Sequence, residues 1–122
     1  MQKEVKTNGR KMSNQMKAVL TILSSDRELM DAAGKHVDWI NESICWEPIL
    51  KIAWGSGHRA ALSYAYGIWR DEIRPQSNPF EDALNMDLHL RRAVIRALAI
   101  RWGLQAGLEV PNEKTYSEGG AV

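Results

Sequence analysis

The sequence predicts an all-α fold, a compact bundle of about five to six helices. Apolar residues recur every three or four positions through most of the chain, which is the spacing of amphipathic helices. Capping residues, glycines and prolines divide these stretches into separate elements. No stretch alternates apolar and polar residues in the way that a half-buried strand does. We expect the C-terminal helix, over residues 87–102, to be the central one.

Composition limits the class of protein. A chain of 122 residues forms about one domain. Its 16 basic and 15 acidic side chains give a net charge of +1, so no global field attracts nucleic acid or an anionic membrane. The single cysteine, Cys45, excludes an internal disulfide and a cysteine-based metal cluster. One cysteine suits a reducing compartment, so we expect a cytoplasmic protein. Because the sequence has neither a leader-like start nor an apolar stretch of roughly 18 residues, we expect neither secretion nor membrane insertion.

The sequence divides into three parts. Residues 1–12 are polar and mainly basic, and we expect them to form a mobile arm. Residues 13–110 hold the periodic segments and are expected to form a single helical domain. Residues 111–122 are polar again, which predicts a mobile tail.

The first two helices are expected over residues 14–23 and 25–42. In the first, apolar residues recur at the i, i+3, i+4 and i+7 positions of one face. At the start of the second, Ser25 and Glu28 have the spacing of a capping box. The apolar residues of the second helix form one arc with His36 in its middle. This position favours a hydrogen-bonded core histidine over a ligand or a catalytic base.

Proline and glycine divide the middle of the chain. Pro48 suits the first turn of a short helix that ends at Trp54, because a first-turn amide has no helical partner. The glycine turn 55–57 follows, and Ser56 can cap a helix over 58–73. Small residues form a strip along this helix, which would let a neighbouring backbone approach closely: Ala60, Ser63 and Gly67.

Two more helices are expected after the proline-rich loop. Asn78 and Pro79 begin a short helix that ends near residue 85. The last helix runs from Asp87 to Trp102, because Gly103 easily takes the left-handed conformation that ends a helix. Apolar residues on two faces predict its central position. They are Leu88, Val94, Ile95, Leu98 and Trp102 on one face, and Leu90, Ala93, Ala97 and Ile100 on the other.

A narrow polar window remains on the last helix. His89, Arg92 and Arg96 align there and could contact phosphates or an acidic partner. A solvated helix face is the simpler interpretation. Arg91 is instead expected to point into the main apolar face, with Asp87 as its ion-pair partner one turn earlier.

The glycine turn is a second candidate site. Ser56, His58 and Arg59 place free amides and a basic pair at a helix start, an arrangement that receives phosphate or carboxylate groups. The turn lacks the lysine and the glycine spacing of a P-loop, so a plain interhelical turn is the simpler interpretation. A helix-turn-helix interpretation of the segment is weak, because Ser63 occupies a position that should be apolar.

The leading function hypothesis is a small non-catalytic helical interaction or regulatory protein that binds a protein partner or a second copy of itself. Five tryptophans against one phenylalanine, together with the two apolar faces of the last helix, indicate more apolar surface than the core obviously needs. Trp46 and Trp54 are the expected exposed anchors, with the window of Arg92 and Arg96 beside them.

Two other function classes stay open. A nucleic-acid accessory protein would use the basic arm with Arg92 and Arg96. A small enzyme would use His36 or His58, although no nucleophile, base and orienting group are recognisable together. No cofactor or metal ion is expected, because no second histidine or cysteine stands at metal-pair spacing from His36.

Overall fold

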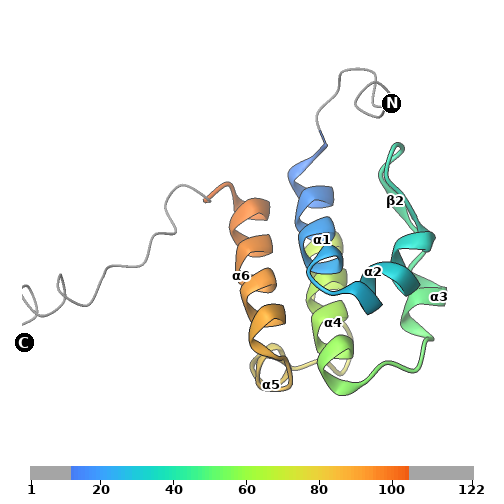
Figure 1. Cartoon of the computed structure of the whole chain (residues 1–122). Coiled ribbons are helices and arrows are strands. Elements are labelled where there is room, and N and C mark those ends of the chain that lie inside the picture. The colour runs from blue at the N-terminus through green and yellow to red at the C-terminus, as the bar shows by residue number, and fades with distance from the viewer. Residues whose placement is uncertain (1–11, 105–122) are drawn as a thin grey trace, which may run out of the picture.

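The computed structural model describes residues 12–104 and confirms the all-α fold (Figure 1). Six α-helices, one 3₁₀ turn and a two-stranded sheet make up this part of the chain. The predicted basic arm, except Met12, and the predicted C-terminal tail lie outside the described residues. The elements are α1 (Asn14–Ser24), α2 (Arg27–Ala33), η2 (Gly34–His36), β1 (Val37–Asp38), β2 (Ser43–Ile44), α3 (Trp46–Leu50), α4 (Ser56–Arg70), α5 (Pro79–Leu84) and α6 (Leu88–Trp102).

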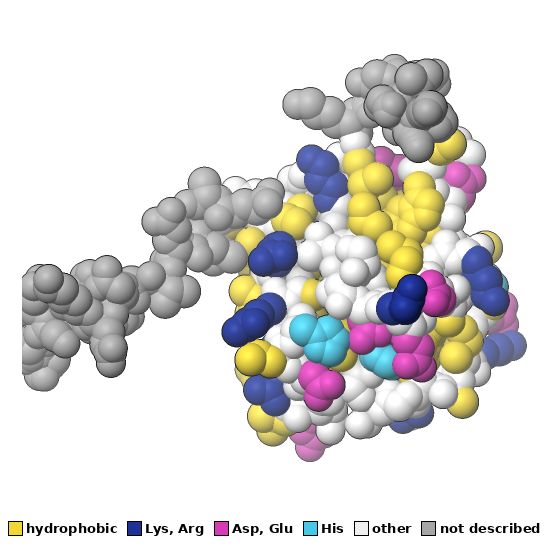
Figure 2. Space-filling model, viewed as in Figure 1, with side chains coloured by type: hydrophobic (Ala, Val, Ile, Leu, Met, Phe, Trp, Pro, Cys, Tyr) yellow, Lys and Arg dark blue, Asp and Glu magenta, His cyan; other side chains and the backbone are white. Residues whose placement is uncertain are grey.

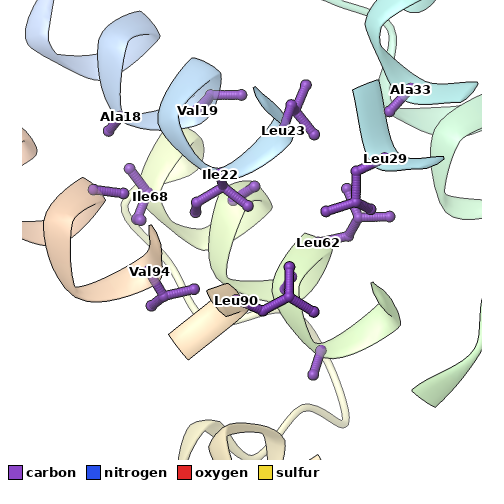
Figure 3. Close-up of a cluster of buried hydrophobic side chains, with 14 of the residues drawn as sticks. Ala18, Val19, Ile22, Leu23, Leu29, Ala33, Leu62, Ile68, Leu90 and Val94 are labelled. Atoms are coloured by element: carbon purple, nitrogen blue, oxygen red, sulfur yellow. The ribbon is translucent and has the colours of Figure 1, made fainter. Parts of the chain in front are cut away.

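The three longest helices pack against one another and enclose the core. In Figure 1, α6 lies on one side of α1, while α2, α3 and the hairpin lie on the other, and α5 closes the base. Figure 3 shows the side chains of the core pointing inward from four helices. The largest fully buried ones include Met16, Ile22 and Leu23 of α1, Leu29 of α2, Leu62 of α4 and Leu90 of α6.

Helix α1 has the predicted start and is tied to the hairpin. The Ser13 hydroxyl accepts a hydrogen bond from the Met16 amide at 3.1 Å, which caps the helix. The same hydroxyl donates to Glu42 at 2.6 Å, and the Ser13 amide donates to the other Glu42 oxygen at 3.0 Å. Glu42, in the loop of the hairpin, therefore anchors this loop to the first turn of α1.

The second helix is shorter than predicted and has a different cap. Asp26, not Ser25, caps it, because the Asp26 carboxylate accepts from the Glu28 and Leu29 amides at 3.0 and 3.3 Å. The helix ends at Ala33, so the predicted continuation to residue 42 is wrong. Beyond the 3₁₀ turn, Val37–Asp38 pairs with Ser43–Ile44 in an antiparallel hairpin.

Two local hydrogen bonds favour a turn where the predicted helix would have continued. The Asp38 carboxylate accepts from the Asn41 amide at 3.1 Å and from the Asn41 side chain at 2.9 Å. Such side-chain bonds to the backbone compete with the helix and favour a turn. His36 consequently lies on the 3₁₀ turn and is only half-buried, so its predicted place in the core is wrong.

The middle helices also begin and end at other residues than predicted. α3 ends at Leu50, and the chain then folds back so that the Trp54 indole donates to the Ile49 carbonyl at 2.9 Å. α4 begins at Ser56 with Gly55 as its cap, so Ser56 is not the cap. It ends at Arg70 rather than residue 73, because Asp71 takes a left-handed conformation with φ of 58°.

Close backbone approach occurs at two glycines of α4. A Cβ atom on Gly57 would lie 2.9 Å from the Asn85 carbonyl oxygen, at the end of α5. A Cβ atom on Gly67 would lie 2.9 Å from the Glu72 carbonyl oxygen. Of the predicted small-residue strip, Gly67 is thus approached by the backbone of the loop that follows α4.

The two C-terminal helices have nearly the predicted bounds. Asn78 caps α5 by accepting from the Phe80 and Glu81 amides at 3.0 and 3.3 Å. α6 is flanked by Asp87 and by Gly103, whose φ of 72° is the left-handed conformation expected at a helix end.

The predicted two-sided burial of α6 is wrong for Leu88, Ile95 and Trp102 of the first face, whereas Val94 of that face is buried and Leu98 packs against the core. The face that contacts α1 and α4 is buried and includes Leu90, Ala93, Val94, Ala97 and Ile100. Ala99 is also buried, although helical geometry places it on the same side of the axis as Leu88 and Ile95. On the opposite face, Leu88, Ile95 and Trp102 are 59%, 57% and 63% exposed. The helix lies at the side of the bundle, and α1 occupies the middle (Figure 1).

Arg91 also differs from its predicted place. Its side chain is exposed and donates to the Ala83 carbonyl at 2.9 Å and to the Leu84 carbonyl at 3.4 Å. These carbonyls lie in the last turn of α5, at the negative end of the helix dipole, so a cation is favourable there. Arg91 therefore joins α5 to α6 instead of pairing with Asp87 inside the bundle.

Candidate functional site: the outer face of helix α6 and the histidine cluster

The two predicted tryptophan anchors are buried, and that prediction is wrong. Trp46 is 9% exposed and packs edge-on against Tyr66, with ring centroids 5.3 Å apart. Trp54 is 6% exposed. The Trp46 indole nitrogen has no hydrogen-bond partner among the residues that the structure describes. Both indoles belong to the core because α3 and the following turn fold back onto the bundle.

Exposed apolar side chains form a stripe along α6 instead. Leu88, Ile95 and Trp102 are each seven residues apart. At about 100° per residue they fall within about 40° of one another around the helix axis. We call this stripe, with the arginines that border it, the α6 outer face.

Arginines border the stripe on both sides. Arg92 and Arg96 project on one side and Arg91 on the other, and all three are exposed. Within residues 12–104, Arg92 and Arg96 form no ion pair with a carboxylate. Figure 2 shows Lys and Arg side chains alternating with apolar ones on the flank where α6 lies. Arg92 and Arg96 therefore lie on an exposed face of α6, as predicted.

Helix α5 and a groove extend this apolar surface at its two ends. Phe80 and Leu84 of α5, at the base of α6, are 86% and 75% exposed. At the other end, Trp102 lines a groove of about 290 Å³ between α4, α6 and the loop 71–77. The groove also includes Ile68 and Leu98, and Arg101 closes one side through its pair with Asp71 at 2.8 Å.

The residues of the predicted anion site do not converge. Ser56 and Arg59 line a polar pocket of about 300 Å³, but His58 does not. The Arg59 guanidinium donates to the Trp54 carbonyl at 3.0 Å. His58 turns towards carboxylates on another helix, so its surroundings are acidic and do not favour an anion.

The histidine cluster lies where the starts of α2, α4 and α6 meet. Asp26 Oδ2 lies 3.1 Å from His58 Nε2 and 3.0 Å from His89 Nε2. Glu28 Oε1 lies 3.6 Å from His58 Nδ1. The sequence predicts that His89 shares the window of Arg92 and Arg96, but in the structure its side chain contacts Asp26. Histidine and acidic side chains lie together on the face shown in Figure 2.

The Asp26 carboxylate is held in its charged form. Burial raises the pKa of Asp26, but hydrogen bonds with His89 and His58 and from the Leu29 amide outweigh this effect and lower the pKa to about 2. One carboxylate therefore caps α2 and also joins it to α4 and α6.

Sequence reasoning missed Asp26 as a site residue. His58 and His89 stand 32 and 63 residues after it, so no local spacing connects the three. The one available signal was the aspartate at the cap position of α2, and the capping-box pattern assigned that role to Ser25.

The constellation of a nucleophilic enzyme is not seen around these histidines. In the described part of the chain, no hydroxyl or thiol is hydrogen-bonded to His58 or His36. Cys45 is exposed on a separate segment. The pairs of His58 with Asp26 and Glu28 offer nitrogen and oxygen ligands without an aligned nucleophile.

Comparison with known proteins adds no relative: family models, curated proteins and solved structures gave no match. None of the helices within residues 12–104 has the length and apolar character required to cross a membrane. The geometry of the described residues therefore carries the functional argument.

Proposed function

We propose that this chain is a non-catalytic helical interaction protein whose α6 outer face binds a protein partner. The observation that carries the proposal is the stripe of Leu88, Ile95 and Trp102, each more than half exposed on a helix whose other face is packed. Large apolar side chains gathered on one surface are typical of interaction sites, whereas single exposed ones are ordinary.

The partner that fits this surface best is an amphipathic helix with acidic flanks. A repeat of seven residues is the spacing with which two helices pack along a seam. Arg92 and Arg96 on one side, and Arg91 on the other, would lie opposite the acidic residues of such a partner. Tryptophan and arginine also dominate the binding energy of many interfaces.

A second copy of the chain fits the same face less well. α6 carries four arginines and no acidic residue between Leu88 and Trp102. In a two-fold pair of α6 helices the same patch faces itself, so arginines of one copy would approach those of the other. Like charges across an interface oppose association.

A pair of synthetic helices tests the proposal. Both peptides have about three heptads and a leucine seam; one carries glutamate on its flanks and the other lysine. Fluorescence anisotropy of the labelled peptides with the full chain measures Kd. We expect micromolar binding of the acidic peptide and at least tenfold weaker binding of the basic one.

Two matched variants locate the binding surface. Ile95→Ser should weaken binding of the acidic peptide about tenfold, since burying half of an isoleucine side chain contributes about 1–1.5 kcal/mol. Ile40→Ser changes an isoleucine that is 46% exposed in the hairpin loop and should leave Kd unchanged. Equal binding of both peptides, or equal effects of both variants, would refute the proposal.

Light scattering and a DNA competition distinguish the alternatives. A dimer in light scattering that Ile95→Ser dissociates would replace the acidic partner by a second copy. Binding of a DNA duplex that displaces the acidic peptide and weakens steeply with salt would favour a nucleic-acid accessory protein.

A further inference from the structure

We propose that Asp26, Glu28 and His58 form a binding site for a divalent transition-metal ion, with Zn²⁺ as the ion that fits best. Their ligand atoms all lie within 4.8 Å of one another. These three residues are not part of the α6 outer face, so the metal-site proposal does not depend on the proposed function.

The spacing of the ligand atoms suits a tetrahedral ion. Zinc bonds to histidine nitrogen and carboxylate oxygen at roughly 2.0–2.2 Å, which places two ligand atoms about 3.4 Å apart. His58 Nε2 and Asp26 Oδ2 are 3.1 Å apart, close to that value. Glu28 faces the other ring nitrogen at 3.6 Å, and its side chain is 68% exposed, so a rotamer change can bring it to the ion.

The charge of the cluster also favours a cation. Asp26 and Glu28 bring two carboxylates together around one imidazole. In the part of the chain that the structure describes, neither forms an ion pair with lysine or arginine. Among the described residues, the side-chain partners of the two carboxylates are histidines, so a divalent ion would add positive charge to the cluster.

Neighbouring groups hold the main ligand in place. Asp26 Oδ1 accepts from the Glu28 and Leu29 amides, while Oδ2 contacts His89 Nε2 at 3.0 Å. Hydrogen bonds of this kind orient a metal ligand and are part of most metal sites. The side chains of His58 and Asp26 are 20% and 15% exposed, so water can reach the ion and complete its coordination.

The ligand types select the ion. Calcium and magnesium prefer oxygen ligands alone, whereas imidazole with carboxylate suits zinc and its neighbours in the first transition row. With three protein ligands and an open position, the site has the composition of a weak or exchangeable zinc site. We therefore expect a micromolar Kd.

The test titrates the full chain, first freed of metal with EDTA, with zinc chloride alone. Isothermal calorimetry should report one ion per chain. The Tm should rise by about 10–20 °C when the free zinc concentration is about a hundred times Kd, because the ion binds the folded state. Cobalt(II) should give the visible spectrum of a nitrogen- and oxygen-bound ion.

Variants decide whether these residues are the ligands. Glu28→Gln and His58→Gln should each weaken zinc binding at least tenfold, and His36→Gln, a histidine outside the cluster, should not. Glu28 is largely exposed, so Glu28→Gln decides the question even if His58→Gln fails to fold. Absence of a calorimetric signal at millimolar zinc, or unchanged binding by Glu28→Gln, would overturn the proposal.

Discussion

Gly57 offers the sharpest test of how the helices are joined, since a single added carbon there should strain the bundle. A Cβ atom at this position would lie 2.9 Å from the Asn85 carbonyl oxygen and 3.8 Å from Leu90 Cδ1. The first of these neighbours is backbone at the end of α5 and cannot rotate away. Gly57→Ala therefore forces the start of α4 and the end of α5 apart.

The magnitude follows from two opposed effects. Alanine is favoured over glycine within a helix by up to about 1 kcal/mol. Overpacking a tight contact costs about 1–3 kcal/mol. We expect Gly57→Ala to lower the free energy of unfolding by about 1 kcal/mol, which lowers Tm by about 4–8 °C in a domain of this size.

Gly34→Ala is the matched control. A Cβ atom on Gly34 would lie 2.8 Å from Met30 Sδ, the far end of a flexible side chain that can move aside. The φ of Gly34 is −61°, which alanine adopts without strain. Gly34→Ala should therefore be neutral or stabilising by up to about 1 kcal/mol. Urea unfolding followed by circular dichroism measures both variants, and equal stability of the two would refute the packing argument.

Three further predictions concern the core, the exposed tryptophan and pH. Leu90→Ala should lower the free energy of unfolding by about 2–5 kcal/mol in urea, because Leu90 is 2% exposed in the core. Trp102→Ala should change it by less than about 1 kcal/mol, because that side chain is 63% exposed. Asp26 has a pKa lowered from 3.8 to about 2, so it stabilises the fold above pH 4 and loses this effect as pH falls from 4 to 2. Between pH 4 and pH 2, urea unfolding in EDTA should show that the free energy of unfolding of the wild type falls by about 1 kcal/mol more than that of Asp26→Asn. This figure allows for the screening of the partly exposed groups by solvent.

Helix ends that depend on one or two residues could be predicted from capping residues and glycine in the sequence. Ser13 caps α1 and Asn78 caps α5, and in both cases the cap hydrogen bond has the expected direction. Gly103 ends α6 in the left-handed conformation. These features need only the conformational preference of one residue and the orphan amides beside it.

The second predicted helix failed because two local preferences competed. Helical periodicity continues past Ala33, but Asp38 and Asn41 can satisfy their own backbone in a turn. The hairpin then gains a second anchor, because Glu42 binds Ser13 at the start of α1. That contact spans 29 residues, so periodicity in a short window could not include it.

The histidine cluster was hidden from sequence reasoning for a related reason. Asp26, His58 and His89 each begin or precede a different helix, and only the packing of α2, α4 and α6 brings them together. Sequence reasoning considered metal ligands at helical spacing around His36 and found none. A site assembled from three helix starts has no such spacing.

The two predicted apolar faces of α6 differ in burial, because only one of them is fully buried against the other helices. The face with Ala93 and Ala97 is buried, because small side chains let α1 and α4 approach the helix closely. Leu88, Ile95 and Trp102, which are larger than these two alanines, stay in solvent on another face. Burying those three would contribute more hydrophobic free energy per residue than burying the alanines. Their exposure therefore leaves a substantial driving force for association, and the arginines on both flanks would direct it towards an acidic partner.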